Sequence, residues 1–421
     1  MPYVHMGKGG AHVDPYRFVA HLASRIASDH GSGRWEEITM VQPTSNAIRS
    51  LSHIACATGL IFTAFPATAQ QLYDTEQAVE LAGYPAVTYF QQGEADKPLI
   101  VFVPGAHHAA RIAYGGHEGA RSEDFLAHWL KEKGYNFLAV SYPIDTESGM
   151  MEATAPDFTA QDWGRQIAEA AASTIEEHGL NGEIYIAHWS MAGKVIQPAH
   201  AALREAGHTV SASFSFAATP GIPGIITLTQ ELDKTEDGYA NRESTYPGWI
   251  AQIAANQGDG DPIIPEDVFR SEYLGHIPVN LQGYGEVVSS GEVQIDHMQQ
   301  AVDYGAFEFA DHPWIVVFQV DARADARHAI NDSAYWSLYN THTLFAELAE
   351  RDLSVNDLSD ETWLDMIAMS QELPERLRVE VGGNHFFFVG EEGARATADA
   401  IDRAIAQVAE LKADIDKLLA E

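Results

Sequence analysis

The sequence predicts a mainly parallel α/β sheet covered by helices on both faces. Short, continuously apolar runs recur along the chain after residue 70, and segments with helical spacing separate several of them. A long stretch with Pro, Gly and scattered aromatic residues interrupts this alternation after residue 220. Continuous apolar strands that alternate with amphipathic helices are typical of a parallel sheet that is buried on both sides.

The elements can be placed along the chain from these patterns. Strands are expected at the apolar runs 86–90, 98–105, 136–143, 183–189, 211–218, 314–321 and 376–383. Helices are expected at 122–134, 159–179 and 194–206, and residues 331–375 are expected to be mostly helical. Residues 221–312 predict an inserted cap or lid, so the core comprises residues 70–220 and 313–421.

The chain is expected to end in a helix over residues 393–420. Its apolar positions recur at helical spacing and comprise Ile401, Ile405, Val408, Leu411, Ile415 and Leu418. Such a stripe predicts packing on the sheet. The alternative for the last two turns is that they extend beyond the sheet and contact a second subunit, which would make the protein a homodimer.

Residues 40–69 have the features of a secretory signal peptide. Arg49 is the only charge, the stretch 51–65 is mostly apolar, and residues 67–69 fit a small-x-small cleavage site before Gln70. The apolar part is too short for a membrane span, and the alternative is a short buried helix. Cleavage would make the protein secreted or periplasmic and residues 1–39 a leader of doubtful relevance. The single cysteine, Cys56, would be removed, leaving no thiol and no disulfide.

The composition is strongly acidic. Lys and Arg number 25 against 60 Asp and Glu, which gives a formal net charge of −35. The excess is spread along the chain, and it argues against nucleic acid or an anionic membrane surface as a partner. A small-molecule substrate is expected instead.

The segment "IYIAHWSMAGKVI" (184–196) places Ser190 directly between a predicted strand and a predicted helix. Ala192 and Gly193 follow, as a turn with little room for side chains requires. A serine on such a turn presents its hydroxyl at the edge of the sheet, and the following helix N-terminus favours an oxyanion. The stretch resembles the nucleophile elbow of the α/β-hydrolase superfamily, with His188 and Ala192 where that motif has glycines.

Partners for Ser190 occur in the order that the resemblance implies. "VEVGGNHFFF" places His385 just after the last predicted strand, where the superfamily has its general base. "VVFQVDARADARHAIND" offers the acid. Asp325 is favoured over Asp321, and Asp332 is the third choice.

The resemblance also implies an oxyanion hole. Its backbone N–H donors would be those of Met191, after the nucleophile, and Ala106, in "VPGAHHAARIAYG" with Pro104 where the family often has histidine. His107 and His108 are candidates for substrate contact or for bracing the loop, and Trp189, beside the nucleophile, is a candidate for substrate contact. No metal site is expected, because the paired histidines lack further ligands at suitable spacing.

Together these features predict a secreted serine hydrolase without an organic cofactor. It would cleave a partly apolar, uncharged carboxylic ester or lactone through an acyl-enzyme, with specificity set by cap residues such as Tyr246, Trp249, Ile250, Tyr273 and Leu274. For most of these aromatic and apolar residues, a place in the cap's own core is the favoured interpretation. Amide cleavage, acyl transfer, a lyase reaction or an inactive binding protein on the same fold are the alternatives.

Overall fold

The computed structural model describes residues 71–152, 155–222, 224–225, 233–235, 238–257 and 260–420. The predicted leader and signal peptide, including Cys56, lie outside these residues. In the described part of the chain, no helix has the length and apolar character needed to cross a membrane.

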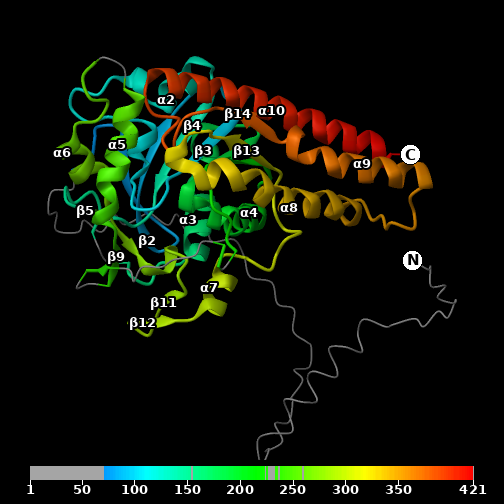
Figure 1. Ribbon diagram of the computed structural model, residues 1–421, viewed down its shortest axis with the longest axis horizontal. Coiled ribbons are helices and arrows are strands. Elements are labelled where there is room, and N and C mark those ends of the chain that lie inside the picture. The colour runs from blue at the N-terminus through cyan, green and yellow to red at the C-terminus, as the bar shows by residue number, and fades with distance from the viewer. Residues whose placement is uncertain are drawn as a thin grey trace, which may run out of the picture. The chain divides into compact units, whose positions relative to one another are not determined.

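An eight-stranded sheet forms the centre of the molecule (Figure 1), in the order β1-β2-β4-β3-β6-β7-β13-β14. β2 runs antiparallel to both of its neighbours, and the remaining pairs are parallel. The strands are β1 (Glu76–Leu81), β2 (Tyr84–Gln91), β3 (Leu99–Val103), β4 (Asn136–Ser141), β6 (Ile184–Trp189), β7 (Val210–Phe216), β13 (Ile315–Gln319) and β14 (Arg378–Glu380). All seven predicted strands are present, which confirms the mainly parallel sheet. The edge strand β1 was not predicted.

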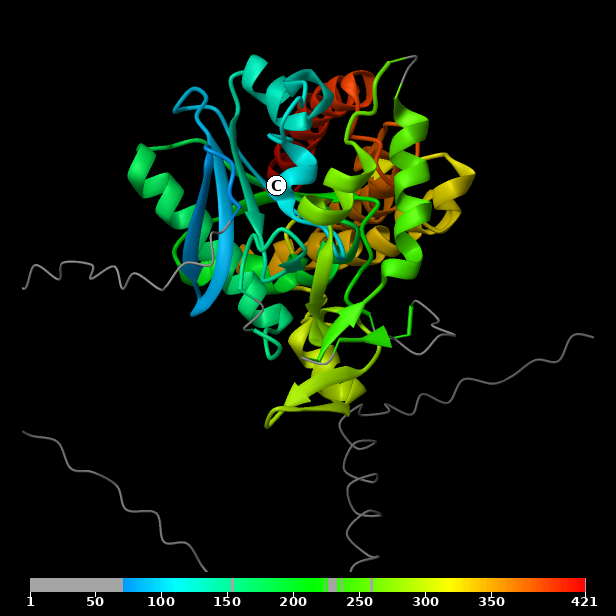
Figure 2. The same ribbon diagram turned by 90° about the vertical axis from the view of Figure 1, so that its left-hand side faces the viewer.

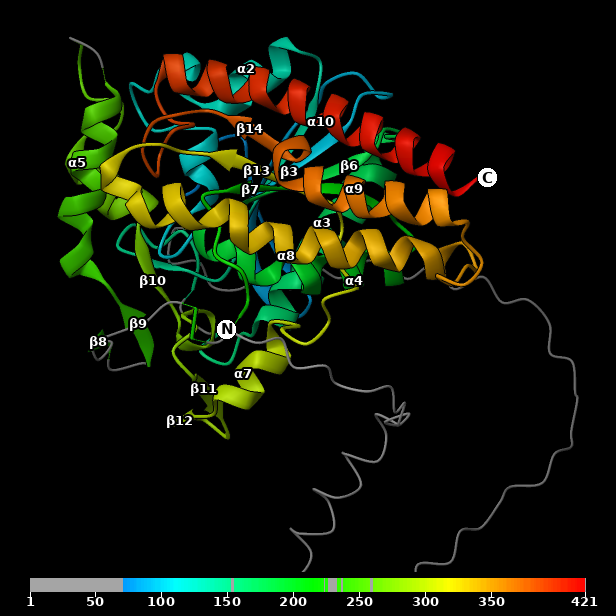
Figure 3. The same ribbon diagram turned by 45° about the vertical axis from the view of Figure 1, so that its right-hand side comes forward.

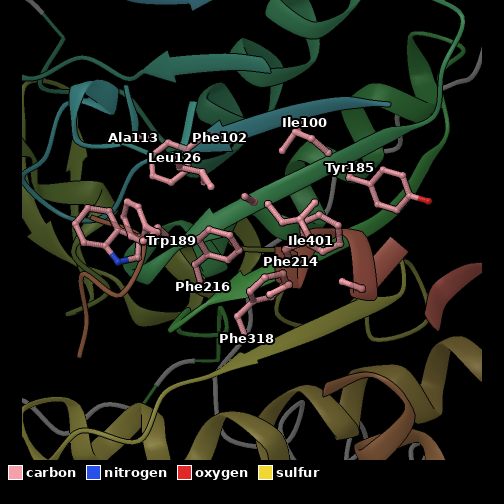
Figure 4. Packing of buried hydrophobic residues seen from close by; sticks show 14 of the residues in the cluster. Ile100, Phe102, Ala113, Leu126, Tyr185, Trp189, Phe214, Phe216, Phe318 and Ile401 are labelled. Atoms are coloured by element: carbon pink, nitrogen blue, oxygen red, sulfur yellow. The ribbon is translucent and has the colours of Figure 1, made fainter. Parts of the chain in front are cut away.

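Helices cover both faces of the sheet because its strands are apolar on both sides. Side chains such as Phe102, Phe214 and Phe318 point to one face, where they pack with Ile401 (Figure 4). This face is covered by α2 (Leu126–Glu132) and α10 (Glu391–Leu419). The alternate side chains of the same strands pack against α3 (Ala160–His178) and α4 (Ile196–Glu205) on the other face. This division between faces follows from the two-residue period of a strand.

Two long helices cover the edge of the sheet at β13 and β14, and Trp336 of the first packs with Ile315 of β13 and Ile196 of α4, on the face opposite Ile401. α8 (Ala326–Glu350) packs beside β13, and α9 (Asp360–Arg376) lies between α8 and α10 (Figure 3). They account for the predicted helical region. On α10, the predicted apolar positions contribute to the core, either fully buried or packed against it.

The stretch between β7 and β13 forms the region predicted as a cap (Figure 2). Its helix α5 (Tyr246–Asn256) lies close to the loop after β14. The stretch also contributes strands β8 to β10 to a small sheet with β5 (Asp145–Thr146), and a hairpin of β11 and β12. Its elements are β8 (Asp233–Lys234), β9 (Tyr239–Asn241), α5, α6 (Glu266–Val268), β10 (Gly275–Pro278), β11 (Glu286–Ser289), β12 (Glu292–Ile295) and α7 (His297–Asp303).

Short helical turns complete the chain. They are η1 (Ala110–Ala113), η2 (Ser122–Asp124), η3 (Ser190–Val195), η4 (Glu243–Thr245), η5 (Phe269–Tyr273), η6 (Val279–Leu281) and η7 (Arg323–Asp325).

Candidate active site

Ser190 lies on a sharp turn between β6 and the 3-10 helix η3, which continues into α4. Its φ angle is 55°, a backbone conformation that a residue other than glycine adopts only at a cost. The turn is fixed by a hydrogen bond of 2.8 Å from the N–H of Thr219 to the Ser190 carbonyl. The structure therefore places Ser190 on the strand–turn–helix that the sequence predicts.

Two glycines allow this turn to form. A Cβ atom on Gly105 would lie 2.8 Å from the Cβ of Ser190, and one on Gly193 would lie 2.4 Å from the carbonyl oxygen of Thr219. Both distances are shorter than atoms tolerate. Gly105 thus lets the loop after β3 approach the serine, and Gly193 lets η3 approach the loop after β7.

His188 occupies the place of the first glycine in the resemblance without blocking the turn. It is buried, and its Nδ1–H donates to the carbonyl of Ala192 over 3.1 Å. Burial lowers the pKa of His188 to about 3, so the ring is neutral. The imidazole thus spans the elbow and braces it from inside.

His385 follows β14 and meets the acid that the sequence favours. Its Nδ1 lies 2.8 Å from Oδ2 of Asp325, and both side chains are only slightly exposed, at 13% and 11%. Burial by itself would raise the pKa of Asp325, but the charge and hydrogen bond of His385 outweigh it and hold that pKa below its usual value. The pair therefore has the geometry of a base oriented by an ionised carboxylate.

The other two aspartates have different partners. Asp321 is exposed and accepts the N–H of Gly383 over 2.8 Å. Asp332 is buried and bonds Nδ1 of His328, at 2.9 and 3.1 Å to its two oxygens. The ring of His328 lies 5.2 Å from that of His385, so a second, buried His–Asp pair adjoins the first. Sequence reasoning did not identify His328.

The loop that carries His385 is tied to its surroundings on two sides. Trp189 donates its Nε1–H to the carbonyl of His385 over 2.9 Å, which links the loop to the end of β6. On the cap side, Gln252 accepts the His385 N–H over 3.2 Å, and Asn256 donates to the carbonyls of Phe386 and Val389. The position of α5 is therefore coupled to that of the candidate base.

Ser190 and His385 are neighbours of the same tryptophan, but their side chains do not form a hydrogen bond here. The Ser190 hydroxyl has no hydrogen-bond partner among the described residues. Such contacts are often long without substrate and shorten when it binds.

The predicted oxyanion donors are free of other partners. Neither the N–H of Ala106 nor that of Met191 meets an acceptor within the described residues. The fully buried Tyr142 donates its hydroxyl to the Gly105 carbonyl over 2.7 Å. Because N–H and C=O point in opposite directions in a trans peptide, this bond fixes where the Ala106 N–H points. Tyr142 has no sequence signal as a positioning residue, since its role depends on contact with a loop 37 residues away.

The three residues proposed for substrate contact are buried in this structure. His107 donates Nδ1–H to the Gly275 carbonyl over 2.9 Å, and Gln282 donates to its Nε2 over 3.1 Å, so it braces the loop against the cap. His108 donates to the Ala106 carbonyl over 2.7 Å and packs among aromatic rings, including Trp189. These contacts agree with the bracing role considered for the two histidines, and substrate contact by the three residues stays a prediction.

One group in the described part of the chain has the spacing of metal ligands. Ligand atoms of Asp325, His328 and His385 lie within 4.8 Å of one another. Arg327 donates to Nε2 of His328 over 2.7 Å, so this ring nitrogen already has a hydrogen-bond partner and is not free to bind a metal ion. The sequence did not predict this cluster because the third ligand comes from a different element.

No protein-family model and no curated protein matches the sequence. Solved structures with a similar arrangement include a putative lipase from Sulfolobus solfataricus, with 10% identity, 80% of this chain and 99% of that chain covered, and a TM-score of 0.42. The carboxylesterase CesB from Bacillus subtilis has 10% identity, coverages of 80% and 93%, and a TM-score of 0.38. A thioesterase domain from the curacin biosynthetic pathway has 12% identity, coverages of 77% and 98%, and a TM-score of 0.36.

The parallel sheet with helices on both faces and the serine turn after β6 agree with the family resemblance. The acid and histidine follow in the order Ser, Asp, His, in the loops after β13 and β14. The chain therefore has the α/β-hydrolase fold.

Proposed function

We propose that this protein is a serine hydrolase that cleaves a carboxylic ester through Ser190, His385 and Asp325. The observation that carries the proposal is the 2.8 Å contact between His385 and Asp325, which come from separate loops, with His385 against Trp189, the residue before Ser190. Chance rarely orients a histidine by a nearly buried carboxylate next to a strained serine and two unpaired N–H groups.

The chemistry follows from this arrangement. The Oγ of Ser190 forms a bond to the ester carbonyl carbon while its proton moves to Nε2 of His385. The N–H groups of Ala106 and Met191 hold the oxyanion. The bond to the alkoxy group then breaks, and that group leaves as an alcohol with the proton from His385. A water molecule then attacks the carbonyl carbon of the acyl-enzyme while its proton moves to His385. The bond to the Oγ of Ser190 breaks, Oγ takes the proton back from His385, and the carboxylic acid is released.

The proposal predicts that a fluorophosphonate probe labels one serine. Intact-mass analysis of the wild type should show a single adduct, and Ser190→Ala should show none. Ser289→Ala, which changes an exposed serine on the β11–β12 hairpin, is the matched control and should label normally.

Hydrolysis provides the second readout. Short-chain neutral esters should be cleaved by the wild type, and His385→Gln should lower kcat/KM by about 10²–10⁴-fold because the proton then has no acceptor. An adduct that persists in folded Ser190→Ala, or folded wild type that neither labels nor hydrolyses, would contradict the proposal.

A further inference from the structure

Lys194 is a buried cation four residues after the candidate nucleophile. Its side chain lies inside the protein, with the residue 7% exposed, and its amino group donates to the carbonyls of Leu281 and Gln282 over 3.1 and 2.6 Å. No carboxylate in the described part of the chain forms an ion pair with it. A buried lysine without a counter-charge is rare. Its two carbonyl contacts leave one of its three N–H groups without an oxygen acceptor, and the ring of Tyr304 lies 5.5 Å from the amino group.

The lysine lines a hollow beside the Ser190 turn. The walls include Thr219, Pro220, Gly221 and Tyr284. The N–H of Thr219 donates to the Ser190 carbonyl. Gly193, the residue before Lys194, packs directly against the backbone of Thr219. The hollow therefore adjoins the elbow on the side of the loop after β7.

Two guanidinium groups add to the positive charge at this place. Arg242 and Arg327 both act electrostatically on Lys194, and both also act on Tyr284 in the wall of the hollow. Within the described residues, Arg242 has no acidic partner, whereas Arg327 bonds the ring of His328 and interacts electrostatically with Asp325 and Asp332. In a chain with 25 basic and 60 acidic residues, Lys194 and Arg242 are two cations without carboxylate partners at one site, and they form a local field that favours an anion.

Burial lowers the pKa of Lys194 to about 7, and the two arginines add to this effect. The negative charge of an anion in the hollow would raise this pKa, so the amine would gain or keep its proton when the ligand binds. Lys194 would then be positively charged whenever the negatively charged ligand is bound.

We propose that the substrate carries a carboxylate group, which the ammonium of Lys194 binds in this hollow while Ser190 attacks an ester elsewhere in the same molecule. This inference rests on the proposed function. A carboxylate fits because one unused N–H offers a single charge-assisted hydrogen bond, whereas a phosphate dianion would need several donors. The competing explanation is that Lys194 only fastens the cap segment at Leu281 and Gln282 to the elbow.

Matched substrates separate the two explanations. Monomethyl esters of C4 to C8 dicarboxylic acids carry a carboxylate, and the corresponding dimethyl esters have nearly the same shape without the charge. Methanol release gives kcat/KM for each member of a pair. The wild type should prefer the monoester at one or more chain lengths by about tenfold or more.

Lys194→Met should lower kcat/KM for the monoester more than for its dimethyl ester, so that the preference falls below about twofold. The exposed Lys131→Met is the control and should keep the full preference. A purely structural role would lower both members of a pair together, and a preference that survives in folded Lys194→Met would overturn the proposal. If Lys194→Met does not fold, Arg242→Gln decides, since it should lower the preference by about three- to tenfold through the loss of one nearby charge.

Different results test the serine hydrolase function and the carboxylate site. Dimethyl ester hydrolysis without a preference for monoesters would overturn the carboxylate site and leave the serine hydrolase intact. If no ester is cleaved, calorimetric titration of the monoesters still tests the site. Binding to the wild type that weakens at least tenfold in Lys194→Met supports it, whereas no binding overturns it. A preference for phosphate-bearing esters over both methyl ester series would also overturn it.

Discussion

Lys194 should make the folding stability of this protein depend on pH. Burial, followed by the smaller effects of Arg242 and Arg327, lowers the pKa of its amino group from 10.5 to about 7. Between these values the unfolded chain binds a proton that the folded chain does not, so the free energy of unfolding rises with pH. At about 1.4 kcal/mol for each unit of pKa difference, this lysine adds about 2 kcal/mol between pH 7 and 9.

Lys194→Met removes the titrating group and keeps most of the side-chain volume. Urea unfolding at pH 7, 8 and 9 gives the free energy of unfolding of both proteins, and the value for the wild type minus that for the variant should become about 2 kcal/mol more positive across the range. The subtraction cancels groups that titrate equally in both proteins. Tyr284 and Tyr304, which adjoin the lysine, have raised pKa values and stay protonated throughout.

Lys131→Met, which makes the same substitution at an exposed position, provides the control. A difference for Lys194→Met that stays constant, within about 0.5 kcal/mol, would refute the reasoning. The lysine would then hold its proton equally in the folded and unfolded chains, and burial would not be the dominant influence on it.

Further predictions concern the acid, two glycines and a buried ion pair. Asp325→Asn should lower kcat/KM for esters by about 10²–10⁴-fold because an amide cannot stabilise an imidazolium, whereas the exposed Asp321→Asn should change it by less than about threefold in the same steady-state assay. Gly193→Ala places a methyl group against a backbone oxygen and should cost about 1–3 kcal/mol in urea unfolding. Gly248→Ala, which meets open space on α5, should be neutral or stabilise by up to about 1 kcal/mol. Arg111→Met leaves a fully buried glutamate without its ion-pair partner and should lower the free energy of unfolding by about 3–5 kcal/mol, measured in the same way.

The sequence predicted the sheet and the position of Ser190 because both depend on local patterns. A buried strand needs a continuous apolar run, and a serine turn needs small residues directly after it, as Gly193 shows by its contact with Thr219. The strand β1 escaped prediction for the opposite reason. It lies at the sheet edge and carries Glu76 and Glu80, so its composition lacks the apolar run of a central strand.

Local sequence patterns could not decide which aspartate contacts His385. Asp321, Asp325 and Asp332 lie within twelve residues and differ little in their sequence surroundings. Their separation in the fold depends on where η7 and α8 begin. That start turns Asp325 toward His385, leaves Asp321 on a loop and buries Asp332 one helical turn beyond His328.

The net charge of the chain likewise does not predict the charge of a small-molecule substrate. A net charge of −35 argues against nucleic acid or an anionic membrane surface as a partner, because such large partners meet the averaged field of the whole surface. A small molecule in a hollow meets instead the few charges within several ångströms, since solvent and salt screen the others. Those charges come from segments far apart in the sequence, Lys194 after β6, Arg242 in the cap and Arg327 at the start of α8. An overall acidic chain can therefore hold a positive site, and the uncharged substrate expected from the sequence gives way to a proposal that the fold alone suggests.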